Sequence, residues 1–202
     1  LYKISQPEAD EIMLTIKTQS GQYRLVLSAN ASLPLAYLTD DNKPSPATAP
    51  NFCKLLRKHL NNGRIISITQ PKFERVIDIE AEHLNELGDL CRKHIIAEFM
   101  GKHSNIILCD DNNTILDSIK HISAQTSSVR EVLPGRPYFI PNTSDKINPL
   151  EADRKHFDET VFTKPIPVVK ALLSSYTGIS TCIAEELAYR AGVDGGHPAN
   201  CL

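Results

Sequence analysis

The residues best suited to chemistry in this chain lie in one short polar stretch, EFMGKHSNIIL, which runs from Glu98 to Leu108. Four polar side chains follow one another in its middle: Lys102, His103, Ser104 and Asn105. Polar groups collect at the ends of rigid elements where they hold a ligand or fix a turn of the backbone. The stretch therefore predicts either a ligand-binding corner or a structural corner between two strands.

Nucleophilic and metal-assisted catalysis both match this stretch poorly. His103 and Ser104 are neighbours, but neither the strained elbow nor the placed acid of a hydrolase accompanies them. No second histidine lies three or four residues from His103, so the spacing predicts no metal site. At turns, Ser and Asn most often bond the local backbone. We leave His103, Ser104 and Asn105 open between a structural corner and a ligand contact, and we expect no metal and no cofactor.

A run of basic residues forms the second group. Its members are Lys54, Arg57, Lys58, Arg64, Lys72 and Arg75, against the single acid Glu74. A helix face and a strand end with this balance suit contact with phosphates, although a solvated helix face has the same composition. The net charge of −2 argues against a uniformly basic nucleic-acid binder but is compatible with a local basic surface.

Glu74 and Arg75 are adjacent, so in a strand their side chains point to opposite faces and cannot form one bidentate site. The planar donor fork of Arg75 suits contact with a nucleic acid. An ordinary charge pair at a strand end is the alternative.

Strands are the main elements that would position these residues. Alternation of apolar and polar residues predicts them over 1–5, 11–18, 23–28, 64–70, 75–81, 94–100 and 105–110, with 114–122 as a hairpin return. The segment NFCKLLRKHL, residues 51–60, has its apolar residues at helical spacing and a stop at Asn62–Gly63, which predicts a helix. The fold class expected is α+β.

The second half of the chain changes character. We expect a domain over 1–142, a polar linker over 143–163 and the start of a truncated helical domain over 164–202. Two helical patterns there are joined by a turn that contains Gly178, as in a helix-hairpin-helix unit. Such a turn can hold a phosphate or serve only packing.

Composition indicates a cytoplasmic protein. The five cysteines are odd in number and scattered, which is typical of a reducing compartment. No apolar run approaches the roughly 20 residues that span a bilayer, so we expect no membrane segment. The first residues, LYKISQPEADEI, alternate like a strand and do not resemble a secretory signal.

Eight segments of the chain occur in an order that is typical of one family. They are QPEADEIMLTI, LVLSA, NFCKLLRKHLNNGRIISITQ, FERVIDIE, AEFMGKHSNIIL, ILDSIKHIS, VLPGRPY and GISTCIAEELAYRAG. In these segments the chain resembles the N-terminal part of the NFACT family, which includes ribosome quality-control factors of the RqcH and NEMF types. The resemblance implies a β-sandwich-type domain like that of MutM-type DNA glycosylases, without its first helix, followed by a helix-hairpin-helix region.

The resemblance also implies partners and site residues. Members of the RqcH type bind a large ribosomal subunit that carries peptidyl-tRNA, and they recruit charged tRNA for template-free alanine tailing. The family's functional residues fall here on Glu74, Arg75, Glu98, Phe99 and Met100, which we expect to contact tRNA. Glu74 stands where many members have Asp, Phe99 replaces an aliphatic residue, and Lys102 replaces Arg. We expect contacts to the RNA backbone from Lys54, Arg57, Lys58, Lys72 and Lys102.

The function expected is therefore that of a ribosome-associated, non-catalytic factor that binds tRNA, alanyl-tRNA above all. One alternative is a surface adhesin that binds fibronectin, as an older name of the family suggests. A DNA glycosylase-like protein is the other alternative, although the chain has neither the Pro-Glu start nor the cysteine cluster of those enzymes.

Overall fold

The computed structural model describes residues 1–141 and 145–202, and this part of the chain divides into two compact units. The first unit comprises residues 1–71 and 75–141. The second comprises Lys72–Glu74 and, of the described residues, 145–202.

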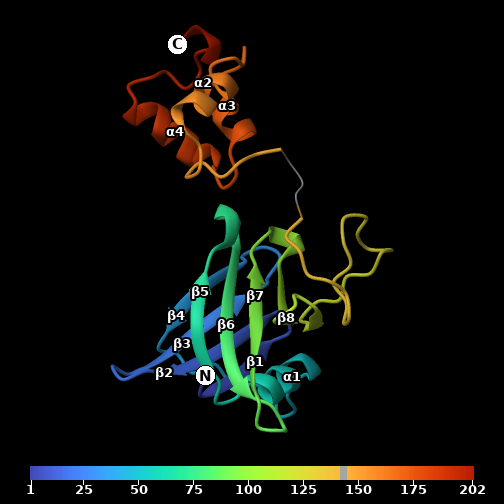
Figure 1. The fold of residues 1–202 in the computed structure, drawn as a ribbon. Helices are drawn as coiled ribbons and strands as arrows, with labels where there is room; N and C mark the ends of the chain where they lie inside the picture. Colours follow the sequence, from blue (N-terminus) through green and yellow to red (C-terminus); the bar gives the residue numbers. More distant parts are fainter. Residues whose placement is uncertain (142–144) are drawn as a thin grey trace. The chain divides into compact units, whose positions relative to one another are not determined.

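Two antiparallel sheets form the first unit (Figure 1). Sheet one has the order β1 (Lys3–Glu8), β2 (Glu11–Lys17), β3 (Gln22–Ser28) and β4 (Leu35–Thr39). Sheet two has the order β5 (Arg64–Thr69), β6 (Val76–Leu84), β7 (Leu90–Glu98), β8 (Asn105–Asp110) and β9 (Ile115–Ser118). Each strand pairs with its neighbour in the chain, so each sheet is a meander built from short connections.

The main core lies between the two sheets and helix α1 (Asn51–Leu60). Alternate residues of the strands point into it, as Ile12 and Leu14 do in β2 and Ile79 does in β6. Helix α1 buries the stripe Phe52, Leu56 and Leu60 against this core and contacts β1, β6 and β9 (Figure 1). The helix predicted over 51–60 is confirmed with the same bounds.

The other face of sheet two carries a smaller core. Val76, Ile96 and Ile107 are buried on this face, together with Val132 from a long segment that follows β9. We call residues 119–141 the cap segment. Backbone hydrogen bonds tie it to the sheet, among them Ile115 N to Arg136 O at 2.8 Å and Tyr138 N to Asn113 O at 2.7 Å.

The described residues 145–202 of the second unit contain three α-helices, α2 (Arg154–Thr160), α3 (Val168–Ser175) and α4 (Thr181–Arg190), and the 3-10 helix η3 (Ala199–Cys201). Asp153 and Ser180 cap the amino ends of α2 and α4 by accepting a backbone hydrogen bond. The buried residues that join the helices are Val161, Val168, Ala171, Leu172, Tyr176, Ala184, Ala188 and Ala199.

The predicted linker over 143–163 is wrong for residues 145–163; positions 143 and 144 lie outside the described residues. Helix α2 occupies its centre, and Val161 is fully buried in the core of the second unit. Phe157 packs against the same core. The segment looked like a linker because most of α2 is polar, whereas two or three apolar residues suffice to dock a short helix.

The sheets differ from the predicted strands in extent. Strand β4 was not predicted. Residues 82–84, which follow the strand predicted over 75–81, are part of β6, where Glu82 forms an ion pair with Arg64 of β5. Helices α3 and α4 are joined by Tyr176–Ser180, in which Gly178 has a φ of 74°, a value that favours glycine. The α+β class is confirmed, while the MutM-like and helix-hairpin-helix assignments remain predictions.

Candidate nucleic-acid interface

Two groups of predicted site residues meet at one corner of sheet two, where β6 begins and β7 ends. Val76 pairs with Glu98 across these strands, and the Phe99 N–H donates to the Arg75 carbonyl at 2.9 Å. The short 3-10 helix η2 (Gly101–His103) then leads into β8. We call Arg75 together with residues 98–105 the sheet corner.

Arg75 presents its guanidinium at the surface of this corner. The residue is exposed, and no ion pair or side-chain hydrogen bond joins it to the residues that the structure describes. Lys102 and His103 are exposed on η2. A planar donor fork with free donors and a neighbouring cation is a chemistry suited to phosphates and bases.

Lys72 and Glu74, the predicted site residues just before Arg75 in the sequence, are not part of the sheet corner. Lys72 and Glu74 group with the second unit. Lys72 is exposed in the 3-10 helix η1 (Pro71–Phe73), with a φ of 52°, and Glu74 is half-buried. Glu74 and Arg75 are therefore neighbours in sequence that belong to different compact units.

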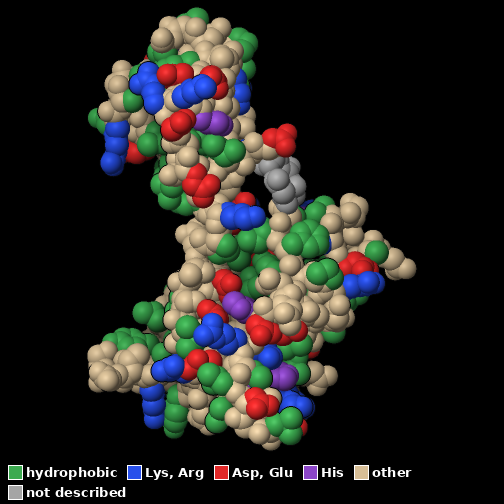
Figure 2. All heavy atoms as spheres, viewed as in Figure 1, with side chains coloured by type: hydrophobic (Ala, Val, Ile, Leu, Met, Phe, Trp, Pro, Cys, Tyr) green, Lys and Arg blue, Asp and Glu red, His purple; other side chains and the backbone are tan. Residues whose placement is uncertain are grey.

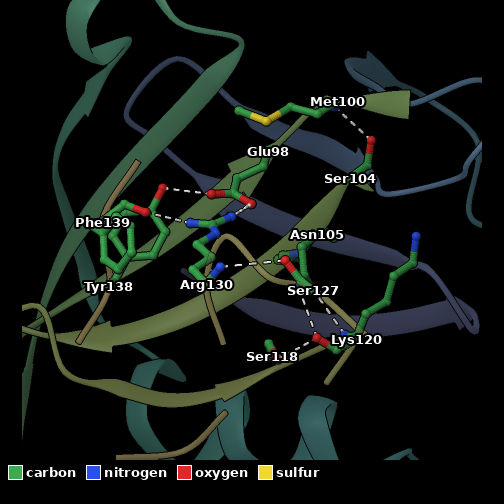
Figure 3. Close-up of polar contacts among 11 residues, drawn as sticks. Glu98, Met100, Ser104, Asn105, Ser118, Lys120, Ser127, Arg130, Tyr138 and Phe139 are labelled. Atoms are coloured by element: carbon green, nitrogen blue, oxygen red, sulfur yellow. Dashed lines mark hydrogen bonds and ion pairs between the residues drawn. The ribbon is translucent and has the colours of Figure 1, made fainter. Parts of the chain in front are cut away.

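The Glu98 side chain points into the protein and is fully buried (Figure 3). Its Oε2 accepts from Arg130 Nη2 at 2.5 Å, and its Oε1 accepts from the Tyr138 hydroxyl at 2.9 Å. Arg130 Nη1 also donates to the Phe139 carbonyl at 2.6 Å. We call Glu98, Arg130 and Tyr138 the carboxylate clamp.

This clamp changes the role expected for Glu98. Its carboxylate has no access to solvent and already accepts from two cap-segment side chains, so a direct contact between it and RNA is disfavoured. Burial raises the pKa of Tyr138, and the adjacent Glu98 carboxylate raises it further, so the hydroxyl stays a proton donor. Nothing in the local spacing identified Arg130 or Tyr138, because both lie in the distant cap segment.

Phe99 and Met100 are half-buried and lie on opposite sides of the sheet corner. Phe99 packs against the main core, and Met100 packs against the smaller core beneath the cap segment. The Met100 N–H donates to Ser104 Oγ at 2.8 Å, which closes the turn of η2 (Figure 3). Gly101 takes a φ of 58° in this turn.

Ser104 and Asn105 are buried and serve the backbone. Asn105 Nδ2 donates to the Lys120 carbonyl at 2.9 Å, and its Oδ1 accepts from the amides of Ile106 and Lys120 at 2.9 and 3.1 Å. These bonds join the start of β8 to the cap segment (Figure 3). Of the two interpretations left open, the structure supports a structural corner for Ser104 and Asn105; exposed His103 stays open.

The basic residues of α1 do not join the sheet corner. Arg57 Nε donates to the Ile4 carbonyl at 2.7 Å, so it is occupied inside the first unit. Lys58 lies 3.3 Å from Glu86 in the connection that follows β6, and Lys54 is exposed. Since β6 is nine residues long, that connection lies about 30 Å along the strand from Arg75. Figure 2 shows Lys and Arg interspersed with Asp and Glu on the visible face of the first unit.

A row that resembles a cysteine hydrolase triad crosses the cap-side face of sheet two, and sequence reasoning missed it. His94 Nδ1 lies 2.9 Å from Asp78 Oδ1, and His94 is opposite Cys109 in the β7–β8 register. Cys109 is buried, which together with the nearby carboxylates raises its thiol pKa to about 12. A thiol in this state is a poor nucleophile at neutral pH.

Two further findings concern metals and membranes. No three His, Cys, Asp or Glu side chains in the described ranges are grouped so that they could hold a metal ion. Within the same residues, no helix is both long and apolar enough to cross a bilayer.

Comparison with curated proteins gives relatives that are named as Rqc2 homologs. The chain is 35% identical over 194 residues to the Rqc2 homolog RqcH of Bacillus subtilis (strain 168), which covers 96% of this chain and 34% of that protein. It is 27% identical over 198 residues to the Archaeal Rqc2 homolog aRqcH of Methanocaldococcus jannaschii, covering 96% and 28%. The chain thus spans about a third of the length of the curated relatives it matches.

Solved structures agree with this relation. The N-terminal domain of the fibronectin-binding protein PavA from Streptococcus pneumoniae superposes with a TM-score of 0.86 at 34% identity, covering 95% of this chain and 71% of that one. The N-terminal part of the fibronectin/fibrinogen-binding protein FBPS from Streptococcus suis has a TM-score of 0.87 at 32% identity, covering 96% and 73%.

The family model described as "NFACT N-terminal and middle domains" matches residues 1–202. The predicted resemblance is confirmed by this match and by the relatives above. The chain belongs to the NFACT family, and its match lies in the family's N-terminal and middle domains.

Proposed function

We propose that this chain is the tRNA- and large-subunit-binding part of a ribosome-associated quality-control factor, and that the sheet corner contacts tRNA. One observation carries the proposal: an exposed arginine, Arg75, without a side-chain partner among the described residues, is held by its backbone beside Phe99. The names of the curated relatives, Rqc2 homolog RqcH, support the process.

In this proposal Arg75 makes the selective contact, through its planar donor fork, to a phosphate or to an unstacked base. Lys102 and His103 lie on the same corner and add contacts to the RNA backbone. The exposed edge of Met100 offers an apolar surface for a base or ribose. Glu98 supports this corner from inside.

The other cations have a secondary role. Lys54, Lys58 and Lys72 supply attraction to the RNA backbone that does not depend on sequence, and Lys58 exchanges its ion pair with Glu86 for a phosphate. Arg57 has a lesser role, because its Nε already donates to the Ile4 carbonyl and holds the side chain against the first unit.

The protein acts here as a binding factor and not as an enzyme. It holds charged tRNA, with alanyl-tRNA as the proposed cargo, on a large ribosomal subunit that carries peptidyl-tRNA. Peptide transfer for C-terminal alanine tailing is then performed by the ribosome, and the site of action is the cytoplasm. Both the non-catalytic role and the absence of a cofactor are part of the proposal.

The decisive experiment compares full-length proteins with Arg75→Ala and with Arg24→Ala. Arg24 is a half-buried arginine of sheet one that donates to the Asp40 carbonyl, and it serves as the control for the loss of one charge away from the sheet corner. We expect Arg75→Ala to weaken tRNA binding about tenfold or more, as for loss of one guanidinium contact, and to abolish alanine tailing. Arg24→Ala should leave both near wild type.

Tailing that continues unchanged in Arg75→Ala would remove this arginine from the proposed site. Measuring tRNA binding across a salt series identifies phosphate contacts, because loss of one such contact lowers the magnitude of the slope of log K against log salt by about 1. We expect that change for Lys54→Ala if it faces RNA.

Fibronectin binding appears in the names of the structural neighbours. No contact or surface described above favours it for this chain, so we do not propose it. Cell fractionation would reveal a surface pool if there were one.

A further inference from the structure

We infer that Arg130 and Tyr138 are positioning residues for the sheet corner: by holding the buried Glu98 carboxylate, they set the geometry in which Arg75 meets tRNA. The inference rests on the proposed function, since it assumes that the corner contacts tRNA. Its structural part, the control of the corner by the cap segment, can be tested without RNA.

Glu98 lies at the centre of the carboxylate clamp. Its carboxylate is fully buried, and the Arg130 side chain is only 10% exposed. A buried carboxylate is tolerated only if hydrogen-bonded partners replace its lost hydration. The Arg130 guanidinium and the Tyr138 hydroxyl supply these partners, one to each carboxylate oxygen.

The backbone links Glu98 to Arg75. Glu98 is the last residue of β7 and pairs with Val76, the first residue of β6. Directly beyond this pair, the Phe99 N–H bonds the Arg75 carbonyl. Movement of Glu98 would therefore shift or release the backbone that carries Arg75.

The planar shape of the Arg130 guanidinium matters for this link. Arg130 uses two different nitrogens, Nη2 for Glu98 and Nη1 for the Phe139 carbonyl, so one planar group joins the strand to the cap segment (Figure 3). Its guanidinium also lies 5.5 Å from the centre of the Tyr138 ring, within reach of a cation–π contact. A lysine offers a point charge and cannot reproduce this fork.

A merely stabilising ion pair makes a different prediction. Buried pairs of this kind can often be replaced by apolar residues of similar size without loss of stability. If the clamp served stability alone, such a replacement would leave RNA binding intact. If it positions the corner, the same replacement weakens RNA binding while the stability of the protein is kept.

The experiment uses the full-length protein with the double variant Glu98→Leu/Arg130→Met, the single variant Arg130→Lys and the control Arg136→Lys. Arg136 lies on the same cap segment in a more exposed ion pair with Glu131. Three quantities are measured for each protein: Tm, affinity for an alanine-tRNA transcript at fixed salt, and hydrogen exchange of the Phe99 and Met100 amides.

We expect the double variant to keep a Tm near wild type but to bind tRNA about tenfold or more weakly, because a loosened supporting shell misplaces the contacting group. Its Phe99 and Met100 amides should exchange faster. Arg130→Lys should show the same two changes in smaller measure, and Arg136→Lys should show neither.

Wild-type binding and wild-type exchange in a stable double variant would overturn the inference. If the double variant loses Tm, Arg130→Lys decides by the same two readouts. If wild-type protein itself does not bind the transcript, the proposed function fails, whereas amide exchange at the corner still supports or overturns positioning by the clamp.

Discussion

Single residues of one type have opposite roles in this protein. Arg75 is exposed and has no side-chain partner among the described residues, whereas Arg130 is almost buried and donates to two acceptors. Lys54 is exposed on α1, but Arg57, one turn later, donates inward to Ile4. Charge alone therefore could not separate candidate RNA contacts from structural donors, because the distinction depends on the acceptors that surround each group.

Cys109 gives a pH prediction at the residue scale. Its thiol pKa is about 12 in the folded protein against 9.0 for the free group. Between pH 9 and pH 12 the unfolded chain loses this proton and the folded chain keeps it, so the free energy of unfolding falls as pH rises, by at most about 1.4 kcal/mol per pH unit. Well below pH 9 the thiol is protonated in both states and contributes no pH dependence.

Urea denaturation at pH 8, 9 and 10 would measure this effect. Cys109→Ala should flatten the fall in the free energy of unfolding above pH 9, and Cys182→Ala, which removes an exposed thiol, should not. Equal slopes in wild type and Cys109→Ala would contradict the prediction.

At the scale of elements, the turn between β7 and β8 is fixed by side chains that bond the backbone. Ser104 closes η2, and Asn105 joins β8 to the cap segment. The sequence correctly predicted a corner between two strands at this place. It did not decide whether the polar residues of the corner are structural or bind a ligand, because turn-forming and ligand-binding residues are of the same types.

Removal of the Asn105 amide should be costly for the corner. Asn105→Ala leaves the Ile106 and Lys120 amides without this acceptor and removes one of the two donors to the Lys120 carbonyl, the other being the Ser118 hydroxyl, so we expect a loss of about 2 kcal/mol or more in the free energy of unfolding. Chemical denaturation measures it. The neighbouring change His103→Ala removes an exposed ring and should stay within about 0.5 kcal/mol of wild type. Losses of similar size in both variants would argue against this role of Asn105.

Strand length was predicted less well than strand identity. Strands β6 and β7 extend further than their apolar alternation indicates, because charged residues near the connection pair across strands, as Glu80 does with Arg92. In a single sequence, charged residues such as these resemble those of a loop. They can be recognised as a stabilising cross-strand pair only when the register of the strands is known.

At the scale of the whole molecule, the described chain has separate cores in its two units. The cores of the first unit and the core around α2, α3 and α4 share no residue. Local stability follows such packing units, so a defect in one core should be felt mainly there.

Phe157→Ala tests this division. The ring packs on the core of the second unit and lies 5.1 Å, centre to centre, from Phe162. Its loss should destabilise that unit by about 2 kcal/mol or more, since an aromatic side chain leaves a cavity. Hydrogen exchange should rise in residues 145–202 and stay unchanged in α1 and the two sheets. A uniform rise across both units would show that they unfold together.

The sequence by itself determined the family, the α+β class, the helix over 51–60 and the importance of Arg75 as a candidate. These properties are carried by motif order and local periodicity, which do not depend on distant segments. Only the tertiary structure decided that Glu98 is buried and that Arg130, 32 residues away in the chain, neutralises it. It also decided that Phe99 lies beside Arg75 and that residues 145–163 belong to a core. Burial and partners follow from strand register and from the path of the cap segment, which bring together groups whose spacing in sequence carries no signal.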